Sequence, residues 1–482
     1  MRRTLLPILL VLAPAAFGQI SLPGGPAAAP SDLRDAAVLA GRPVFLTAGA
    51  GLIARFDPQT GALDTFYLGL DIRTIGEAAG GLMLLASGPD GTHLLDENLS
   101  VIFSFGASGD DTGGIPGTTR GFILSRSGQY VEFFELGAPG ILAHVDFDDE
   151  PTGCAPAPES LLVALAGGTL VHLDTDGNEL GRVDLTQSLS GVAVSGNVAL
   201  GLDRALGTLT AVDLDGLDTI GTLSGLDDPE SVHAVGTTAF VIESDGRVET
   251  VDVDPLSTRF MKRRAEFRVD GAVSVVGDGG DYYVTRADRS GVATGTFAAL
   301  DAAPVLDAIA PTYGVPGTRV TGGTPGTTWA VFEGDAMTLH QTEPLRVPLQ
   351  TATARTLRAG RTVDGGAVTS ATYPFWVVDS PAALAMLTPE MKEAGYKKAA
   401  KFLDQARKHL KHGRLHQFAF KLKQALEVAG PYARRIAEIA QYESWKVVTA
   451  ETQADFDSGE AALENDDYTE AAHSFLECMC NE

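Results

Sequence analysis

The stretch that decides the fold is LIARFDPQTG, residues 52–61, because its outline returns along the chain at a fixed step. A short apolar-rich run leads to an acidic residue, here Asp57, and a tight turn follows. The acid recurs at a constant step of 39 (96 minus 57) at Asp57, Asp96, Glu135, Asp174, Asp213 and Asp252. A period near 40 built from short strands and Gly/Asp turns is typical of propeller blades, whereas helical repeats show 3.6-residue spacing.

Each repeat is interpreted as a meander of four strands. In the first, strands at 36–40 and 43–47 precede the one that ends at Phe56, and the Asp-Pro-x-Thr-Gly turn leads into a strand at 62–68. In that turn the Asp accepts backbone N–H groups, Pro fixes φ and Gly supplies positive φ. The recurring acids are therefore predicted to cap turns rather than to bind metal.

The repeat predicts a closed ring. After Asp252 the register shifts: a longer strand through 259–267 precedes strands at 272–276, at 282–286 and ending near Asp301, which we count as a seventh, irregular unit. Seven times 39 is 273, close to 270, the length of the stretch 32–301 (301 minus 32, plus one). We predict a seven-bladed β-propeller at 32–301, since ring closure protects strand edges.

The N-terminus has the features of a secretory signal. Two arginines precede an apolar stretch, and a small-x-small site ends at Gly18. We predict a signal peptide at 1–18, a linker at 19–31 and export to the periplasm or the outside of the cell. The apolar stretch is too short to cross a bilayer, and no stable membrane span is predicted elsewhere.

The net charge bears on the class of partner, and the number of cysteines bears on disulfide bonding. A net charge of −26 disfavours nucleic acid, whose phosphates need clustered Lys and Arg. Three cysteines, Cys154, Cys478 and Cys480, cannot form a disulfide framework in a chain of 482 residues. A bridge from Cys154 to one of the C-terminal cysteines stays open at this stage.

The turn at 57–61 resembles the bacterial YVTN and quinoprotein-like propeller repeats. That resemblance covers the stretch 32–301 and implies a fold rather than an activity. Quinoprotein dehydrogenases carry tryptophan docking motifs in their blades, whereas Trp329, Trp376 and Trp445 all lie outside the predicted propeller. The Trp-Asp dipeptide of WD40 blades is absent as well.

Two further domains are predicted. Residues 304–320 resemble the opening of an immunoglobulin-like module of the IPT/TIG type, and strands alternate with Gly/Pro turns up to 373–378, so a small β-sandwich is predicted at 302–379. Lys, Ala, Leu and Glu then dominate, with Thr388 predicted as an N-cap and Pro389 at the first helical position.

The C-terminal region at 380–482 is predicted to be helical and similar to tetratricopeptide repeats. The small/large spacing of that family appears twice at an offset of 53 (459 minus 406), which implies an extra helix near 432–449. The positions that carry it best are Phe456, Gly459, Ala462, Tyr468, Ala471, Phe475 and Cys478, and the weaker copy contains Phe402, Ala406, Gly413, Leu415, Phe418, Leu422, Ala425 and Leu426.

The candidate ligand-binding residues are acids in the longest predicted loops, on the face opposite the capped turns. They are Asp110, Asp111, Asp148, Asp149, Glu150, Asp227 and Asp228. Oxygen-rich clusters at a propeller mouth suit Ca²⁺, and solvated loop charge is the competing interpretation. The cofactor is otherwise unknown.

Histidines and cysteines provide weaker metal candidates. His409, His412 and His416 have metal-like spacing, but Gly413 is predicted to end a helix between them. His473 with Cys478 and Cys480 gives three soft ligands, although Cys478 also fits a core position.

We detect no nucleophile elbow, phosphate loop or paired carboxylates, and predict no catalytic residues. The leading hypothesis is a secreted, non-catalytic binding or scaffold protein with a protein or small-molecule ligand. The alternative is a metal-dependent, lactonase-like hydrolase or an oxidoreductase with its site in the propeller channel. A further hypothesis is that basic helical residues dock on the acidic propeller. These residues are Lys397, Lys398, Lys401, Arg407, Lys408 and Lys411.

Overall fold

The structure, a computed structural model, describes residues 18–20, 33–47, 51–185, 188–278, 280–286, 292–323, 327–334, 336–340, 344–350, 353–362 and 368–480. The chain divides into two compact units. Of the described residues, one unit contains those between 18 and 303 together with 368–371, and the other contains those between 304 and 362 together with 372–480. Residues 1–17 of the signal peptide predicted at 1–18, and residues 21–31 of the predicted linker, lie outside the described residues, whereas Gly18 lies in a strand.

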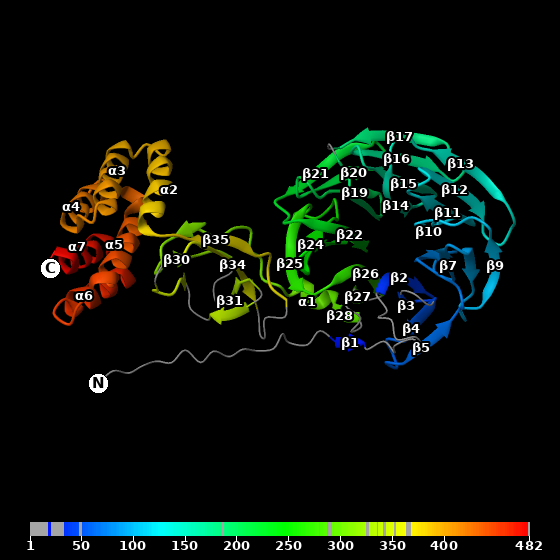
Figure 1. The fold of residues 1–482 in the computed structure, drawn as a ribbon, viewed down its shortest axis with the longest axis horizontal. Coiled ribbons are helices and arrows are strands. Elements are labelled where there is room, and N and C mark those ends of the chain that lie inside the picture. Colours follow the sequence, from blue (N-terminus) through cyan, green and yellow to red (C-terminus); the bar gives the residue numbers. More distant parts are fainter. Residues whose placement is uncertain are drawn as a thin grey trace. The chain divides into compact units, whose positions relative to one another are not determined.

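The first unit holds seven four-stranded antiparallel sheets within the described residues (Figure 1). In chain order they are β2 to β5 (Leu33–Leu39, Arg42–Thr47, Leu52–Phe56, Leu63–Tyr67), β6 to β9 (Thr74–Ala78, Met83–Gly88, Gly91–Leu95, Val101–Phe105), β10 to β13 (Asp111–Gly114, Arg120–Ser125, Tyr130–Glu135, Ile141–Asp146), β14 to β17 (Pro151–Ala157, Ser160–Leu165, Thr169–Asp174, Glu179–Asp184), β18 to β21 (Gly191–Ser195, Val198–Asp203, Thr208–Asp213, Asp218–Ser224), β22 to β25 (Pro229–Val235, Thr238–Glu243, Arg247–Asp252, Lys262–Arg268), and β26 to β28 (Ala272–Asp278, Asp281–Arg286, Val292–Thr296) with β1 (Gly18–Ile20).

The sheets close into a β-propeller. The first strand of each sheet contacts the first strand of the next, and β26 contacts β2, so these strands surround the centre while the fourth strands lie outside (Figure 1). Side-chain hydrogen bonds also link the inner strands to their neighbouring sheets. The Thr74 hydroxyl donates to Asp35 Oδ2 at 2.7 Å, and the Ser195 hydroxyl donates to the Gly236 carbonyl oxygen at 2.7 Å.

The repeated acids behave as predicted at five of their six positions. Each of these five carboxylates accepts a backbone N–H from the turn that follows it, as Asp57 Oδ1 does from Gln59 and Thr60 at 2.9 and 3.2 Å. The five are Asp57, Asp96, Asp174, Asp213 and Asp252. Glu135 differs, because its carboxylate accepts from the Thr119 hydroxyl and pairs with Arg120 at 3.2 Å.

The last sheet corrects two sequence predictions. Its third strand ends at Thr296 instead of near Asp301, because Thr296 Oγ1 accepts the Ala299 N–H and starts the helix α1 (Phe297–Asp301). Its fourth strand is β1, which pairs with β28 and overlaps the first two residues of the predicted linker at 19–31. The ring therefore closes with a strand from the chain's beginning, because the irregular last repeat supplies only three strands.

The propeller core lies between adjacent sheets. Most of its buried apolar clusters join one sheet to the next, as Val131 and Phe133 of the third sheet pack with Leu161 and Val163 of the fourth. Backbones also approach closely. A Cβ on Gly76 would lie 1.9 Å from the Thr112 carbonyl oxygen, so only glycine fits where β6 passes β10.

The second unit begins with a small β part. A five-stranded sheet has the order β29, β35, β34, β31, β32 (Tyr313–Gly314, Tyr373–Val377, Arg355–Thr362, Thr328–Glu333, Ala336–His340), and β30 (Arg319–Val320) pairs with β33 (Leu345–Arg346). At its centre the Arg361 guanidinium lies 3.8 Å from the centroid of the buried Trp329 ring. The strand predicted at 373–378 is confirmed as β35.

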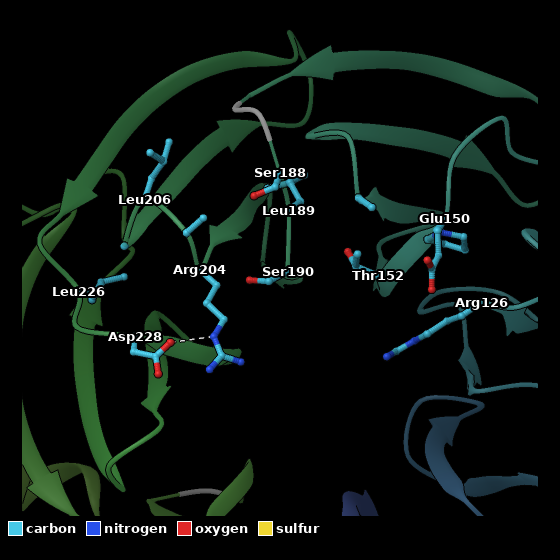
Figure 2. A pocket seen from close by; sticks show the side chains of 14 residues that line it. Arg126, Glu150, Thr152, Ser188, Leu189, Ser190, Arg204, Leu206, Leu226 and Asp228 are labelled. Atoms are coloured by element: carbon cyan, nitrogen blue, oxygen red, sulfur yellow. Dashed lines mark hydrogen bonds and ion pairs between the residues drawn. The ribbon is translucent and has the colours of Figure 1, made fainter.

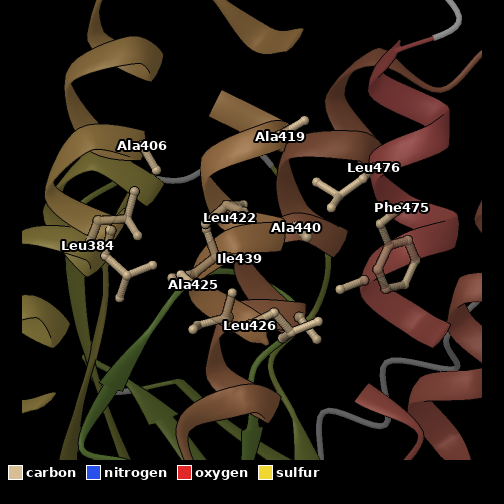
Figure 3. Packing of buried hydrophobic residues seen from close by; sticks show 14 of the residues in the cluster. Leu384, Ala406, Ala419, Leu422, Ala425, Leu426, Ile439, Ala440, Phe475 and Leu476 are labelled. Carbon is tan, nitrogen blue, oxygen red and sulfur yellow. The ribbon is translucent and has the colours of Figure 1, made fainter. Parts of the chain in front are cut away.

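The rest of this unit is helical, and its helices share one apolar core (Figure 3). The helices are α2 (Ser380–Glu393), α3 (Lys397–Lys411), α4 (Leu415–Leu426), the 3₁₀ turn η1 (Gly430–Tyr432), α5 (Ala433–Val447), α6 (Gln453–Glu464) and α7 (Tyr468–Cys480). α5 is the extra helix expected near 432–449. None of the helices within the described residues is long and apolar enough to cross a membrane.

The first helix starts earlier than its sequence suggested. Asp379, not Thr388, is the N-cap, since its side chain accepts the Ala382 N–H at 2.9 Å. Pro389 then lies inside α2, and the Thr388 hydroxyl donates to the Leu384 carbonyl oxygen at 2.7 Å. The Thr-Pro pair matches a helix start, but buried residues on both sides of it, Leu384 and Met391, keep the chain helical through the proline.

Candidate functional site

A hollow of the propeller lies over two kinds of loop from four neighbouring sheets, those that lead into the inner strands and those between the second and third strands (Figure 2). We call it the mouth pocket, and its volume is about 860 Å³. It is lined by Arg126, Glu150, Pro151, Thr152, Ala166, Ser188, Leu189, Ser190, Arg204, Ala205, Leu206, Gly207, Leu226 and Asp228. Ligand pockets commonly measure about 300 to 1,000 Å³, so this size suits a small organic molecule or a short peptide.

The pocket is built from a repeated arrangement of charge. Arg126 and Arg204 occupy equivalent positions two repeats apart, since 204 minus 126 is 78, twice 39. Glu150 and Asp228 are separated by the same two repeats (228 minus 150), so each arginine is followed by an acid at the same offset along the chain. The propeller thus presents the same Arg and acid pair twice in one pocket.

The two pairs differ in geometry. Arg204 Nε donates to Asp228 Oδ1 at 2.8 Å, and the Arg204 guanidinium also lies 3.5 Å from Glu230. This hydrogen bond lowers the pKa of the Asp228 carboxyl. Arg126 and Glu150 form no such bond, and neither side chain makes a hydrogen bond or ion pair with any residue in the described part of the chain. We call Arg204 with Asp228 the closed pair, because its members bond to each other, and Arg126 with Glu150 the open pair.

Hydroxyl and apolar groups complete the lining. Thr152, Ser188 and Ser190 lie between the two arginines, whose guanidinium groups point into the hollow from opposite sides (Figure 2). Leu206, which is 61% exposed, adds apolar surface to the pocket lining. The arrangement can therefore accept charged, hydrogen-bonding and apolar parts of one ligand.

A second, smaller hollow of about 230 Å³ lies among the inner strands β6, β10 and β14. We call it the channel pocket. Glu77, Asp111 and Cys154 line it, and the Cys154 thiol donates to Asp111 Oδ2 at 3.3 Å. Burial raises the pKa values of the Asp111 carboxyl and the Cys154 thiol. The channel pocket therefore presents one acid and one thiol that already form a hydrogen bond with each other.

Asp35 is a further ionisable group on an inner strand. Its Oδ2 accepts from the Thr74 hydroxyl at 2.7 Å and from the Ile75 N–H at 3.0 Å. Burial raises the pKa of Asp35 from 3.8 to about 6, and the charge of Asp111 adds to the effect. These two acids from the first and third sheets therefore influence each other near the centre of the ring.

Replacing Asp35 by asparagine should change how stability depends on pH. Between about pH 4 and pH 6 the folded protein keeps a proton that the unfolded chain has lost, so the stability contributed by Asp35 is full at low pH and falls as pH rises through 6. We expect the wild type to lose about 2 kcal/mol relative to Asp35→Asn between pH 4 and pH 7, measured by urea unfolding at both values.

Asp57→Asn is the matched control. The turn N–H groups that Asp57 accepts lower the pKa of its carboxyl, so its contribution is present at neutral pH and is lost as pH falls. The two variants should therefore respond to pH in opposite directions. Equal pH dependence of wild type and Asp35→Asn would show that Asp35 ionises freely.

The acids predicted from sequence separate into three groups. Glu150 and Asp228 line the mouth pocket, and Asp111 lines the channel pocket. The other four do not line either pocket: the carboxylates of Asp110 and Asp149 accept backbone N–H groups, Asp227 pairs with Arg247 at 2.9 Å, and Asp148 lies exposed.

The predicted metal candidates are not brought together. His409 lies in α3, Gly413 follows its end with φ of 66°, and His416 lies in α4. Cys478 is buried and its thiol donates to the Thr452 carbonyl oxygen, while Cys154 and Cys478 are both free. Within the ranges that the structure describes, no three His, Cys, Asp or Glu side chains are placed to hold a metal ion.

Sequence reasoning missed Arg126, Arg204 and the hydroxyl residues of the mouth pocket. The signal was present in the repeat, because both arginines directly precede the small turn residues Ser127 and Ala205 that keep the register of the repeat. The same position is Leu165 in the fourth sheet. At this repeat position the third and fifth sheets have arginine and the fourth has leucine, so the change from charged to apolar residue distinguishes the sheets whose arginines line the pocket.

Comparison with known proteins yields no family. No family model matches the chain, and no curated protein matches it. The WD40 β-propeller domain of Doa1 is 13% identical, covers 57% of this chain and 95% of its own, and has a TM-score of 0.47. Hydrazine synthase of Kuenenia stuttgartiensis is 12% identical, covers 57% and 99%, and has a TM-score of 0.48. The propeller architecture follows from the sheet order described above.

Proposed function

We propose that this chain is a secreted, non-catalytic binding protein whose ligand occupies the mouth pocket of the propeller. The observation that carries the proposal is the composition of that pocket, where two arginines, two acids, three hydroxyls and exposed Leu206 converge from four sheets. Concave sites with apolar walls and a few converging polar groups are the usual form of ligand sites.

The remaining modules support a role in interaction. We infer that the seven sheets are the blades of a seven-bladed propeller, that the β part at 302–379 is an Ig-like spacer, and that the helices at 380–482 are tetratricopeptide-like. Secretion rests on the signal-like sequence at 1–18. Docking of the basic α3 residues on an acidic propeller stays a prediction, and two of them, Arg407 and Lys408, already pair with Asp404 at 2.8 and 2.9 Å.

The proposal is tested with a pocket-filling variant. We expect Ser190→Trp to weaken binding of any pocket ligand at least tenfold, because a large ring would occupy space between the arginines. Amino acids, short peptides, sugars, organic acids and nucleotides would be screened by thermal shift on the full chain. A ligand that raises the melting temperature of the wild type should fail to do so with Ser190→Trp.

Thr60→Trp, in an exposed turn of a capped hairpin, is the control and should bind like the wild type. The recovered ligand should also be chemically unchanged after prolonged incubation. Turnover of a lactone or sugar that is lost on replacing Asp111 would instead establish the enzymatic alternative. Equal binding by wild type and Ser190→Trp for every ligand found would place the binding site elsewhere.

A further inference from the structure

The mouth pocket has balanced charge, and this limits the kind of ligand that it complements. Arg126 and Arg204 supply two positive charges, and Glu150 and Asp228 supply two negative ones. A purely anionic ligand would meet both acids in a chain of net charge −26, and a purely cationic ligand would meet both arginines. Neither class pairs with every charged group of the pocket.

The open pair, Arg126 with Glu150, offers one positive and one negative side chain to the charged groups of a ligand. The closed pair, Arg204 with Asp228, already satisfies most of its own charge at 2.8 Å. The equivalent pair, Arg126 with Glu150, lies open to the pocket, with no hydrogen bond or ion pair to any residue that the structure describes. The third and fourth sheets thus leave one guanidinium and one carboxylate available within a single hollow.

We propose that the mouth pocket binds a zwitterion of the amino-acid type, with its carboxylate on Arg126 and its ammonium group on Glu150. Arginine holds carboxylates through two parallel N–H donors, and a carboxylate accepts from an ammonium group. The apolar part of the ligand lies toward Leu189, Leu206 and Leu226. This inference names the ligand class of the proposed function and rests on it.

Leucine and two blocked analogues test the inference directly. N-acetylleucine keeps the carboxylate and loses the ammonium charge, while leucinamide keeps the ammonium charge and loses the carboxylate. We expect leucine to bind the full chain at least tenfold more tightly than either analogue in calorimetric titration. A Leu-Leu dipeptide tells the two sources of this chemistry apart, since the tighter ligand identifies a free amino acid or a peptide.

Substitutions of Arg126 and Glu150 should each weaken binding of leucine, but each should spare a different blocked analogue. Arg126→Gln should weaken leucine about tenfold and leave leucinamide unchanged, because leucinamide does not use the guanidinium. Glu150→Gln should weaken leucine similarly and leave N-acetylleucine unchanged. Arg73→Gln, an exposed arginine outside the pocket lining, is the matched control and should bind leucine like the wild type.

Three outcomes would overturn the inference: N-acetylleucine binding as tightly as leucine, leucinamide doing so, or no binding of leucine and Leu-Leu at all. Each of these leaves the proposed function standing if another ligand from the thermal-shift screen is lost in Ser190→Trp. Failure of the proposed function itself has a different signature, because bound ligands would then be insensitive to Ser190→Trp.

Discussion

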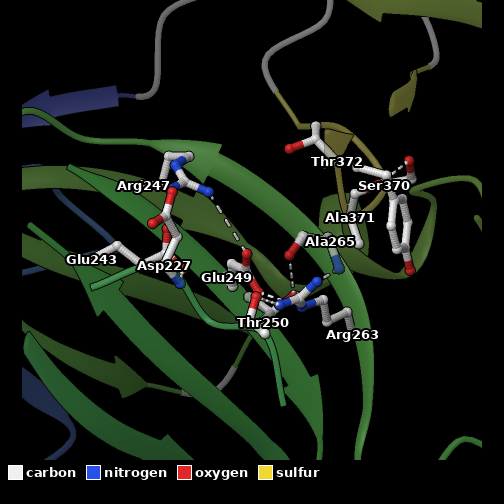
Figure 4. Close-up of polar contacts among 12 residues, drawn as sticks. Asp227, Glu243, Arg247, Glu249, Thr250, Arg263, Ala265, Ser370, Ala371 and Thr372 are labelled. Carbon is white, nitrogen blue, oxygen red and sulfur yellow. Dashed lines mark hydrogen bonds and ion pairs between the residues drawn. The ribbon is translucent and has the colours of Figure 1, made fainter. Parts of the chain in front are cut away.

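Arg247→Met is expected to destabilise the propeller by about 3 to 5 kcal/mol, because it leaves the buried Glu243 carboxylate without its cation, whereas Glu249 keeps Arg263 at 2.7 Å. The Arg247 side chain is 8% exposed and the Glu243 and Glu249 side chains are 0% and 2% exposed. Arg247 Nη2 lies 2.6 Å from Glu243 Oε2 (Figure 4), and its Nε lies 2.7 Å from Asp245 Oδ2. Burial alone would lower the pKa of Arg247, but Glu243 and the other acids raise it.

A second substitution separates loss of charge from loss of packing. In Arg247→Met with Glu243→Gln, one buried carboxylate disappears with the arginine, so about 1 to 3 kcal/mol should be recovered over the single variant. Urea unfolding followed by circular dichroism measures the free energy of unfolding of both variants. A single-variant cost below about 1 kcal/mol would show that the network is solvated.

The repeat positions explain why this network and the mouth pocket were hard to foresee. Glu243 occupies in the sixth sheet the position that Arg126 and Arg204 occupy in the third and fifth. In the sixth sheet it is buried against Arg247, whereas the two arginines project into the pocket. The register predicts which residues share a position, but burial depends on neighbouring sheets far away in sequence.

Local patterns predicted local structure well. The apolar run before each repeated acid forms the third strand of its sheet, and the turn chemistry of Asp57 and Asp174 needs only neighbours within the same turn. The pairing of β1 with β28 joins residues that are more than 270 positions apart in the sequence (294 minus 18 is 276), and no local signal marks it. The start of α2 was misplaced for a related reason, since tertiary packing overrides a proline within the helix.

Phe475→Ala should destabilise the helical region by about 3 to 5 kcal/mol, because it removes a fully buried ring from the shared core of the helices (Figure 3). The ring of Phe475 fills the space that Gly459 leaves, since a Cβ on Gly459 would lie 2.5 Å from it. It also packs on Phe456 with ring centroids 5.5 Å apart. Phe475 lies at a large position and Gly459 at a small position of the predicted repeat.

Because the chain forms two compact units, the two variants should act on different unfolding transitions. Phe475→Ala should lower the transition of the second unit, which contains the helices, and Arg247→Met should lower that of the propeller. Tryptophan fluorescence reports the second unit alone, since Trp329, Trp376 and Trp445 all lie in it, whereas far-ultraviolet circular dichroism reports both. If Phe475→Ala shifted both signals equally, the units would unfold as one, and the stability of the ring would depend on the helices.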